Sequence, residues 1–278
     1  MKEFWGTLTT HIKRGIISPM FLFCMALCAF LMVLFIAENY NTVYRVAPGL
    51  YYFLNMVDNR GAEYLIMMIT AFPGAIMFYE DWKSGNFKFI ISRAGRGNYT
   101  FAVTIAAGIT AAVVMIISYL IFSAVVLIKF PAVPDMTAEE LRTRSFGFPN
   151  SGLLYTGHAF LCYLLYFLTK GAMAAFFAVF AVFQSMIFTN KHLTAISPVF
   201  IYIIYFSFNL FYITPTLLNP FVMFWNGYKL YLVFGGTEDG SLYSPIAGVY
   251  PIIYTVAIVI ILSLIEMKIL RKKMNRSI

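Results

Sequence analysis

The sequence predicts an all-α membrane protein that crosses the bilayer several times. Hydrophobic residues make up 61% of the chain and charged residues only 12%, whereas a soluble domain is nearer half apolar and a quarter charged. Several apolar runs exceed about 18 residues, which is long enough for a helix to cross a hydrocarbon core. The runs are apolar all round, which argues against strands that alternate apolar and polar residues.

Six membrane-spanning helices are expected in a single domain that covers residues 1–278. They lie at about residues 17–37, 64–79, 100–130, 159–188, 196–213 and 251–269. Before the first span, Phe4, Leu8 and Ile12 recur every fourth position, which predicts an amphipathic helix in the membrane interface. Before the last span, short apolar pieces broken by Pro and Gly between residues 214 and 250 predict a re-entrant segment on the outer side.

The distribution of Lys and Arg predicts the orientation. They concentrate in both termini, in residues 80–99 and in the short turn at 189–195. The side richer in Lys and Arg is cytoplasmic, so both termini are expected inside and the loops at 131–158 and 214–250 outside. The net charge of +8 is then explained by this topology and by anionic lipid headgroups. No nucleic acid partner is expected.

A short charged segment, residues 80–96, separates the second and third spans. Its apolar residues share one helical face: Phe87, Ile90, Ile91 and Ala94. Its polar residues share another: Lys88, Ser92 and Arg96. Gly85 and Gly95 bound this stretch, so a short amphipathic helix under the membrane is predicted. An ordinary solvated basic loop is the alternative.

This segment resembles the loop after the second span in the type-two (ABC-2-type) permease subunits of ABC exporters. The family pattern is a Glu, a Ser-Gly pair, a hydrophobic stretch, a Ser-Arg pair and a closing Arg. In that family the loop is the coupling helix that docks on the ATP-binding subunit. The resemblance therefore implies these docking positions: Glu80, Ser84, Gly85, Phe87, Lys88, Phe89, Ile90, Ile91, Ser92, Arg93 and Arg96.

The resemblance extends to both ends of the chain. Residues 11–14 and 18–21 read His-Ile-Lys-Arg and Ser-Pro-Met-Phe, similar to the family's entry into its first span. Residues 269–273, Ile-Leu-Arg-Lys-Lys, resemble its basic exit. Two positions depart from the family pattern: Asn86 stands where Thr is usual, and Ala94-Gly95 replace a Pro-hydrophobic pair. The six-span layout also fits.

Membership would imply a transmembrane permease subunit of an ATP-driven exporter, which moves substrate out of the cytoplasm or the inner leaflet. The chain has no G-x-x-x-x-G-K-[ST] motif, so no catalytic site and no directly bound cofactor are expected. ATP and Mg²⁺ would sit on the partner, a cytoplasmic ABC ATPase subunit. A second permease, as a homodimer or heterodimer, and membrane lipids complete the implied partners, in a bacterial cell membrane.

Lys170 is the ionisable side chain that lies deepest in an apolar run. An intramembrane charge is costly and by default indicates a functional site. Tyr163, Tyr166 and Gln184 share its helix face, so the four residues predict a polar stripe along a substrate path. Alternatively, the Lys170 amine snorkels to the outer interface.

Two other groups of polar residues carry weaker expectations. Glu266, Lys268 and Arg271 are interpreted as a charge cluster at the interface in preference to a proton relay. His11, His158 and His192 lie far apart in the sequence, so no metal site is predicted.

Two other classes of function remain open. A stand-alone secondary transporter or channel would need a coupling-ion site, usually carboxylates within the spans. An integral-membrane lipid-modifying enzyme would need paired acids, and Glu80-Asp81 is the one candidate pair. A neighbouring gene for an ABC ATPase would favour the exporter.

Overall fold

The computed structural model describes residues 2–37, 49–59, 62–145, 148, 150–187 and 245–276, together with residues 196, 200 and 203. All regular structure in these ranges is helical. Four helices are long and apolar enough to cross a membrane: α2 (Pro19–Ala37), α7 (Arg96–Leu127), α10 (Ala159–Ser185) and α15 (Pro245–Arg276, through its part Gly248–Lys272). Within the described residues, the prediction of a helical protein with several helices suited to cross a membrane is thus confirmed.

Four of the six expected spans correspond to these four helices. The span expected at 64–79 lies in α5 (Ala62–Ser84), a helix of 23 residues with Pro73 inside it, which is not one of the four. The span expected at 196–213 and the re-entrant segment at 214–250 lie almost wholly outside the described residues. Six spans therefore stay a prediction.

α7 forms the centre of the bundle, and it packs against α1, α2, α5, α10 and α15. Small residues allow these close approaches, as is common between membrane helices. A Cβ added to Gly74 of α5 would lie 2.7 Å from the Ala107 carbonyl oxygen of α7, and one added to Gly171 of α10 would lie 2.8 Å from Ile116. At 32 residues, α7 is about 48 Å long.

Five shorter helices complete the described fold. α1 (Lys2–Ile16) is the expected N-terminal amphipathic helix, and it packs on α7, with Leu8 against Ala102 and Ala106. α6 (Asn86–Ala94) connects α5 to α7. α8 (Ala138–Arg144) and α9 (Gly152–Tyr155) lie in the loop expected at 131–158, and α8 begins with a capping box between Thr137 and Glu140.

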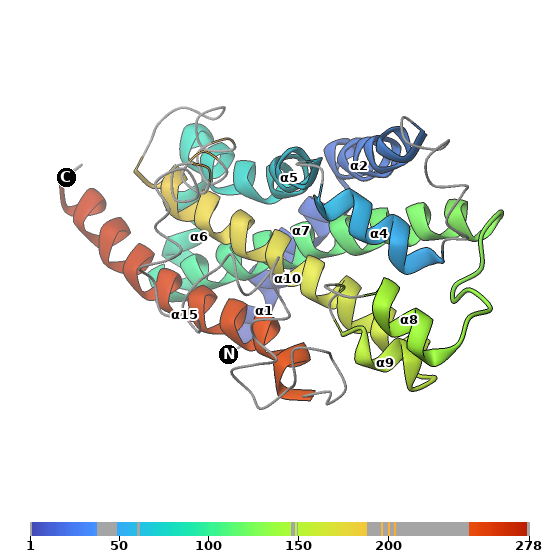
Figure 1. Cartoon of the computed structure of the whole chain (residues 1–278). Helices are drawn as coiled ribbons and strands as arrows, with labels where there is room; N and C mark the ends of the chain where they lie inside the picture. Colours follow the sequence, from blue (N-terminus) through green and yellow to red (C-terminus); the bar gives the residue numbers. More distant parts are fainter. Residues whose placement is uncertain are drawn as a thin grey trace.

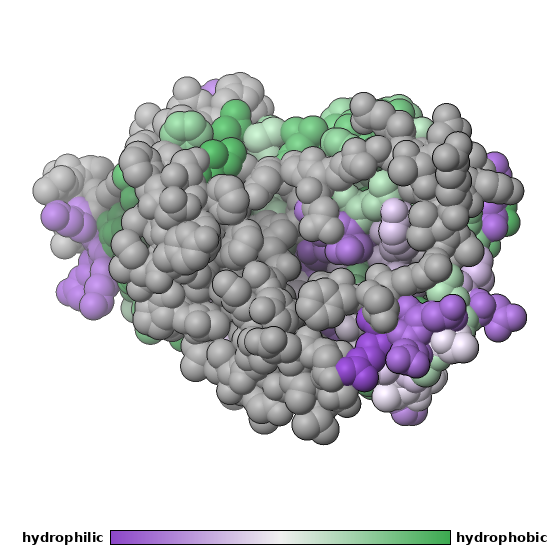
Figure 2. Space-filling model, in the orientation of Figure 1, coloured by the Kyte–Doolittle hydropathy of each residue, from purple (hydrophilic) through white to green (hydrophobic). Residues whose placement is uncertain are grey.

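The bundle has two distinct ends (Figure 1). One, called the α6 end, joins the last turns of α5, α10 and α15 to α6 and the start of α7, in a cluster that includes Phe78, Phe87 and Leu270. The other, called the α8 end, carries α8, α9 and α4 (Leu50–Asn59). On the face shown in Figure 2, hydrophilic residues gather over α8 and near the C-terminal end of α15.

Candidate functional site

α6 is a short connector with one buried face. Two glycines in left-handed or otherwise positive-φ backbone bound it: Gly85 at φ 75° and Gly95 at φ 81°, conformations that other residues rarely adopt. Phe87, Ile91 and Ala94 are buried. The Phe87 ring stacks on Trp82 of α5 with 4.4 Å between centroids. α6 is therefore fixed against α5 and α7, as its amphipathic pattern predicts.

The opposite face of α6 is exposed and carries both apolar and basic groups. Phe89 is 73% exposed, and Lys88, Ser92 and Arg93 are exposed beside it. The docking positions on α6 that the family resemblance implies thus divide into two sets. Phe87 and Ile91 contact their own chain, whereas the four exposed residues are accessible to a partner. Aromatic residues and Arg are enriched at protein interfaces, so this face has a composition that suits a contact surface.

The remaining docking positions flank this face. Glu80 and Ser84 are exposed on the last turns of α5, where the Ser84 hydroxyl donates to the Glu80 carbonyl oxygen at 2.7 Å. Arg96 begins α7 and is half-buried. Ile90 lines a cavity of about 410 Å³ between α1 and α6, together with His11 and Arg14 of α1.

An ion-pair cluster joins α1 to the end of α5. The Arg14 guanidinium donates to Asp81 Oδ1 at 2.5 Å and to Glu80 Oε2 at 2.8 Å. Tyr99 of α7 donates its hydroxyl to Asp81 Oδ2 at 3.1 Å, and His11 Nδ1 lies 3.9 Å from the same oxygen. Asp81 thus has a structural role in holding α1. From the sequence, it is a candidate only for a catalytic acid pair with Glu80.

His11 is the uncharged member of this cluster. Its side chain is 2% exposed, and within the described part of the chain its Nδ1 atom has no hydrogen-bond partner. Burial lowers the pKa of His11 below its ordinary value, while the nearby Asp81 carboxylate opposes this shift and Arg14 adds to it. We therefore treat His11 as neutral near pH 7.

Lys170 has a buried counter-ion at the α8 end. Its Nζ atom lies 3.0 Å from Asp58 Oδ2 of α4, and the two side chains are 1% and 11% exposed. The Tyr166 hydroxyl donates to Asp58 at 2.9 Å and the Tyr119 hydroxyl at 3.3 Å. The Lys170 amine is thus held inside the protein and does not snorkel to a surface.

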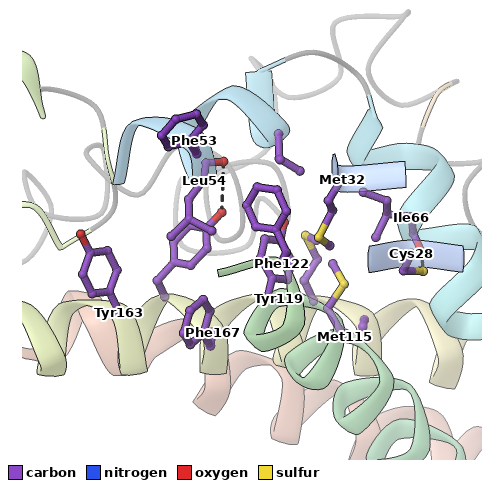
Figure 3. Close-up of a cluster of buried hydrophobic side chains, with 14 of the residues drawn as sticks. Cys28, Met32, Phe53, Leu54, Ile66, Met115, Tyr119, Phe122, Tyr163 and Phe167 are labelled. Carbon is purple, nitrogen blue, oxygen red and sulfur yellow. Dashed lines mark hydrogen bonds between the residues drawn. The ribbon is translucent and has the colours of Figure 1, made fainter. Parts of the chain in front are cut away.

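The other predicted stripe residues separate. Tyr163 donates its hydroxyl to the Ala132 carbonyl oxygen at 2.5 Å. The Tyr163 ring lies in a cluster of buried side chains, several of them aromatic, between α4, α7 and α10 (Figure 3). Gln184 is 3% exposed and lies 14 residues beyond Lys170, about 21 Å along the helix towards the α6 end. The structure thus brings Tyr163, Tyr166 and Lys170 to one end of the bundle and places Gln184 near the other.

α4 and Asp58 are absent from the sequence-based prediction, which treats residues 38–63 as a loop. The signal was present: Leu50, Phe53, Leu54 and Val57 recur with helical spacing and are all buried. An intramembrane lysine commonly pairs with another ionisable group or with backbone carbonyls, and Asp58 directly follows that apolar pattern. The pairing itself joins residues 112 positions apart and needed the three-dimensional structure.

The position of Glu266 differs from the interfacial charge cluster expected from the sequence. It is 0% exposed and lies against α7, where Thr104 Oγ1 is 2.5 Å from Glu266 Oε2. Lys268 and Arg271 are exposed, so they do not form a cluster with Glu266. The interpretation as an interfacial charge cluster is wrong, because residues two or five positions apart point to different sides of a helix.

In the described ranges, no three His, Cys, Asp or Glu side chains gather as metal ligands. Comparison with protein-family models, with curated proteins and with solved structures finds no match to this chain.

Proposed function

We propose that the chain is the transmembrane permease subunit of an ATP-driven exporter of the type-two ABC family. Two permeases and two cytoplasmic ATPase subunits would form the transporter, with ATP and Mg²⁺ bound by the ATPases. Substrate would leave the cytoplasm or the inner leaflet. The α6 end, with both termini, would face the cytoplasm, since Lys and Arg concentrate there. The multi-pass helical bundle is consistent with this role.

The observation that carries the proposal is the exposed face of α6. A helix fixed at both ends passes a displacement to its neighbours, and α6 connects α5 directly to α7. Phe89 is 73% exposed on its outer face, beside Lys88 and Arg93. An aromatic anchor flanked by basic residues is a typical centre of a protein interface. We therefore assign the ATPase contact to Lys88, Phe89, Ser92 and Arg93.

The substrate path proposed from Tyr163, Tyr166, Lys170 and Gln184 would be closed in this conformation. Tyr166 and Lys170 are bonded to Asp58 of α4, and α4 packs between α2, α5 and α7. Substrate release at the α8 end would then require α4 to move away from α10. The Asp58–Lys170 pair is the contact that this movement breaks.

Phe89→Asp tests the proposal by co-purification with the ABC ATPase subunit that the proposal requires. The charge should weaken co-purification at least tenfold, since truncation of an interface anchor costs about 2 kcal/mol or more. Phe160→Asp is the matched control, because Phe160 is 81% exposed at the opposite end. Unchanged binding by the Phe89 variant would remove the docking role, and with it the main support for an exporter.

A secondary transporter is the second candidate, and the buried ionisable groups favour it. Asp58, Lys170 and Glu266 are largely excluded from solvent, as coupling-ion sites in such proteins are. Proteoliposomes that contain this chain alone separate the two functions. Uptake driven by an ion gradient, with neither ATP nor an ATPase subunit, would support the secondary transporter.

A further inference from the structure

Glu266 is a buried carboxyl group that the proposed function does not use. It lies on α15 near the α6 end, one residue before Met267, whose sulfur would be 3.3 Å from a Cβ added to Gly97 of α7. Its side chain is fully enclosed. Thr104 Oγ1 lies 2.5 Å from Glu266 Oε2, whereas Oε1 has no hydrogen-bond partner within the part of the chain that the structure describes.

The hydrogen atoms of this contact can be counted. The Thr104 hydroxyl has one hydrogen, and two oxygens lie within reach: Glu266 Oε2 at 2.5 Å and the Thr100 carbonyl oxygen at 2.9 Å. A carboxylate can only accept, so an ionised Glu266 would take that hydrogen from Thr100. A protonated Glu266 instead donates from Oε2 to Thr104, and Thr104 donates to Thr100. The second arrangement satisfies both short distances.

The surrounding charges agree with this count. On α7, Arg96 begins the helix, Tyr99 donates to Asp81, and Tyr119 donates to Asp58. On α10, the Lys170 amine pairs with Asp58 at the α8 end, where Cys162, Tyr163 and Tyr166 also lie. Lys268 and Arg271 of α15 itself are exposed. No described cation therefore neutralises Glu266, and an unpaired carboxylate here would cost several kcal/mol.

Ser263 is a second buried polar residue on the face of α15 that carries Glu266. It is 0% exposed, and its hydroxyl oxygen also has no partner among the described residues. Residues three apart are neighbours on a helix, so Ser263 and Glu266 place two buried oxygen atoms with unused hydrogen-bonding capacity one turn apart. A buried polar group without a partner calls for an explanation, and a functional role is one such explanation.

We propose that Glu266 is a proton-binding site: it holds a proton on Oε2, donated to Thr104, while α15 lies on α7, and releases it to water when the two helices part. α7 begins directly after α6, so a displacement of α6 would move Thr104 relative to Glu266. That last step rests on the proposed function. The proton site itself does not, and its tests need no ATPase.

Infrared spectroscopy of the purified chain at pH 7 tests the protonation state directly. Wild type should show a carboxylic acid carbonyl band that Glu266→Gln removes, because Gln keeps the shape and can still donate to Thr104. Glu3→Gln, at an exposed glutamate, should leave the band unchanged. If the Glu266→Gln difference instead shows loss of a carboxylate band, Glu266 is ionised and the proposal fails.

Unfolding as a function of pH gives a second, independent test. The folded protein holds one proton that unfolded Glu266 has lost above its ordinary pKa, so folding becomes less favourable as pH rises. The unfolding equilibrium constant of wild type relative to Glu266→Gln should increase up to tenfold per pH unit above about pH 5. Parallel profiles for the two proteins would overturn the proposal.

Discussion

The two ion pairs that hold short helices against the bundle differ in their access to water. At the α8 end, Lys170 and Asp58 fix α4 with side chains that are 1% and 11% exposed. At the α6 end, Arg14 fixes α1 to Asp81 and Glu80, and the exposures are 38%, 1% and 55%. Water can replace part of the second contact and almost none of the first. The same chemistry therefore gives a firm contact at one end and an adjustable one at the other.

This difference agrees with the proposed roles of the two ends. A partner that docks on α6 would act beside α1, where Arg14 can exchange protein oxygens for water as the helices shift. The α4 contact has no such intermediate, because separation of Lys170 from Asp58 breaks an ion pair that is almost fully shielded from water. The α8 end would thus change between two discrete states.

Lys170→Met should have the largest effect on stability. It leaves the Asp58 carboxylate buried, with the Tyr166 and Tyr119 hydroxyls as its remaining partners among the described residues. Loss of one member of a buried pair costs about 3–5 kcal/mol, and we expect a loss of that size in the free energy of unfolding in detergent.

A double variant separates the charge from the packing. Asp58→Asn combined with Lys170→Met removes both charges, so it should recover most of the stability that Lys170→Met loses. Lys13→Met, at an exposed lysine of α1, is the matched control and should have little effect. If Lys170→Met is tolerated as well as Lys13→Met, the ion pair does not hold α4.

Particular residues show what the sequence could and could not predict. The faces of α6 were predictable because Phe87, Ile91 and Ala94 follow helical periodicity, and all three are buried. The helix α4 was missed although its apolar spacing was visible, and the direction of Glu266 was misread although helix geometry separates it from Lys268. The Asp58–Lys170 and Arg14–Asp81 pairs join distant segments. Local periodicity carries no information about such contacts.

Arg14→Met should have an intermediate effect. Asp81 is buried, but it keeps the hydroxyl of Tyr99 at 3.1 Å, and the vacated guanidinium position borders the cavity between α1 and α6, which water can enter. A hydrogen bond to a charged group contributes about 1.5–3 kcal/mol, and we expect a loss within that range in the same unfolding measurement.

Glu80→Gln is the control for Arg14→Met. Glu80 is 55% exposed, and exposed ion pairs contribute about 1 kcal/mol or less. A loss from Glu80→Gln as large as that from Arg14→Met would mean that exposure does not separate the two bonds of Arg14, and the contrast between the two ends would weaken.

His11 should produce an effect that depends on pH. Burial lowers its pKa in the folded protein, whereas the unfolded chain has the ordinary value of 6.5. Below pH 6.5 the unfolded state therefore binds a proton that folded His11 does not. Folding loses up to about 1.4 kcal/mol per pH unit as the pH falls, until folded His11 is itself protonated.

His11→Phe should remove this acid sensitivity, because a phenyl ring can keep the edge contact with Tyr99, whose centroid lies 5.9 Å from that of His11. Thermal unfolding between pH 7.5 and pH 5 measures it, and wild type should fall further than the variant. His158→Phe changes an exposed histidine and should leave the profile as in wild type. If wild type becomes more stable with acid relative to His11→Phe, Asp81 holds a protonated His11, and the α6 end contains a buried cation in place of a neutral ring.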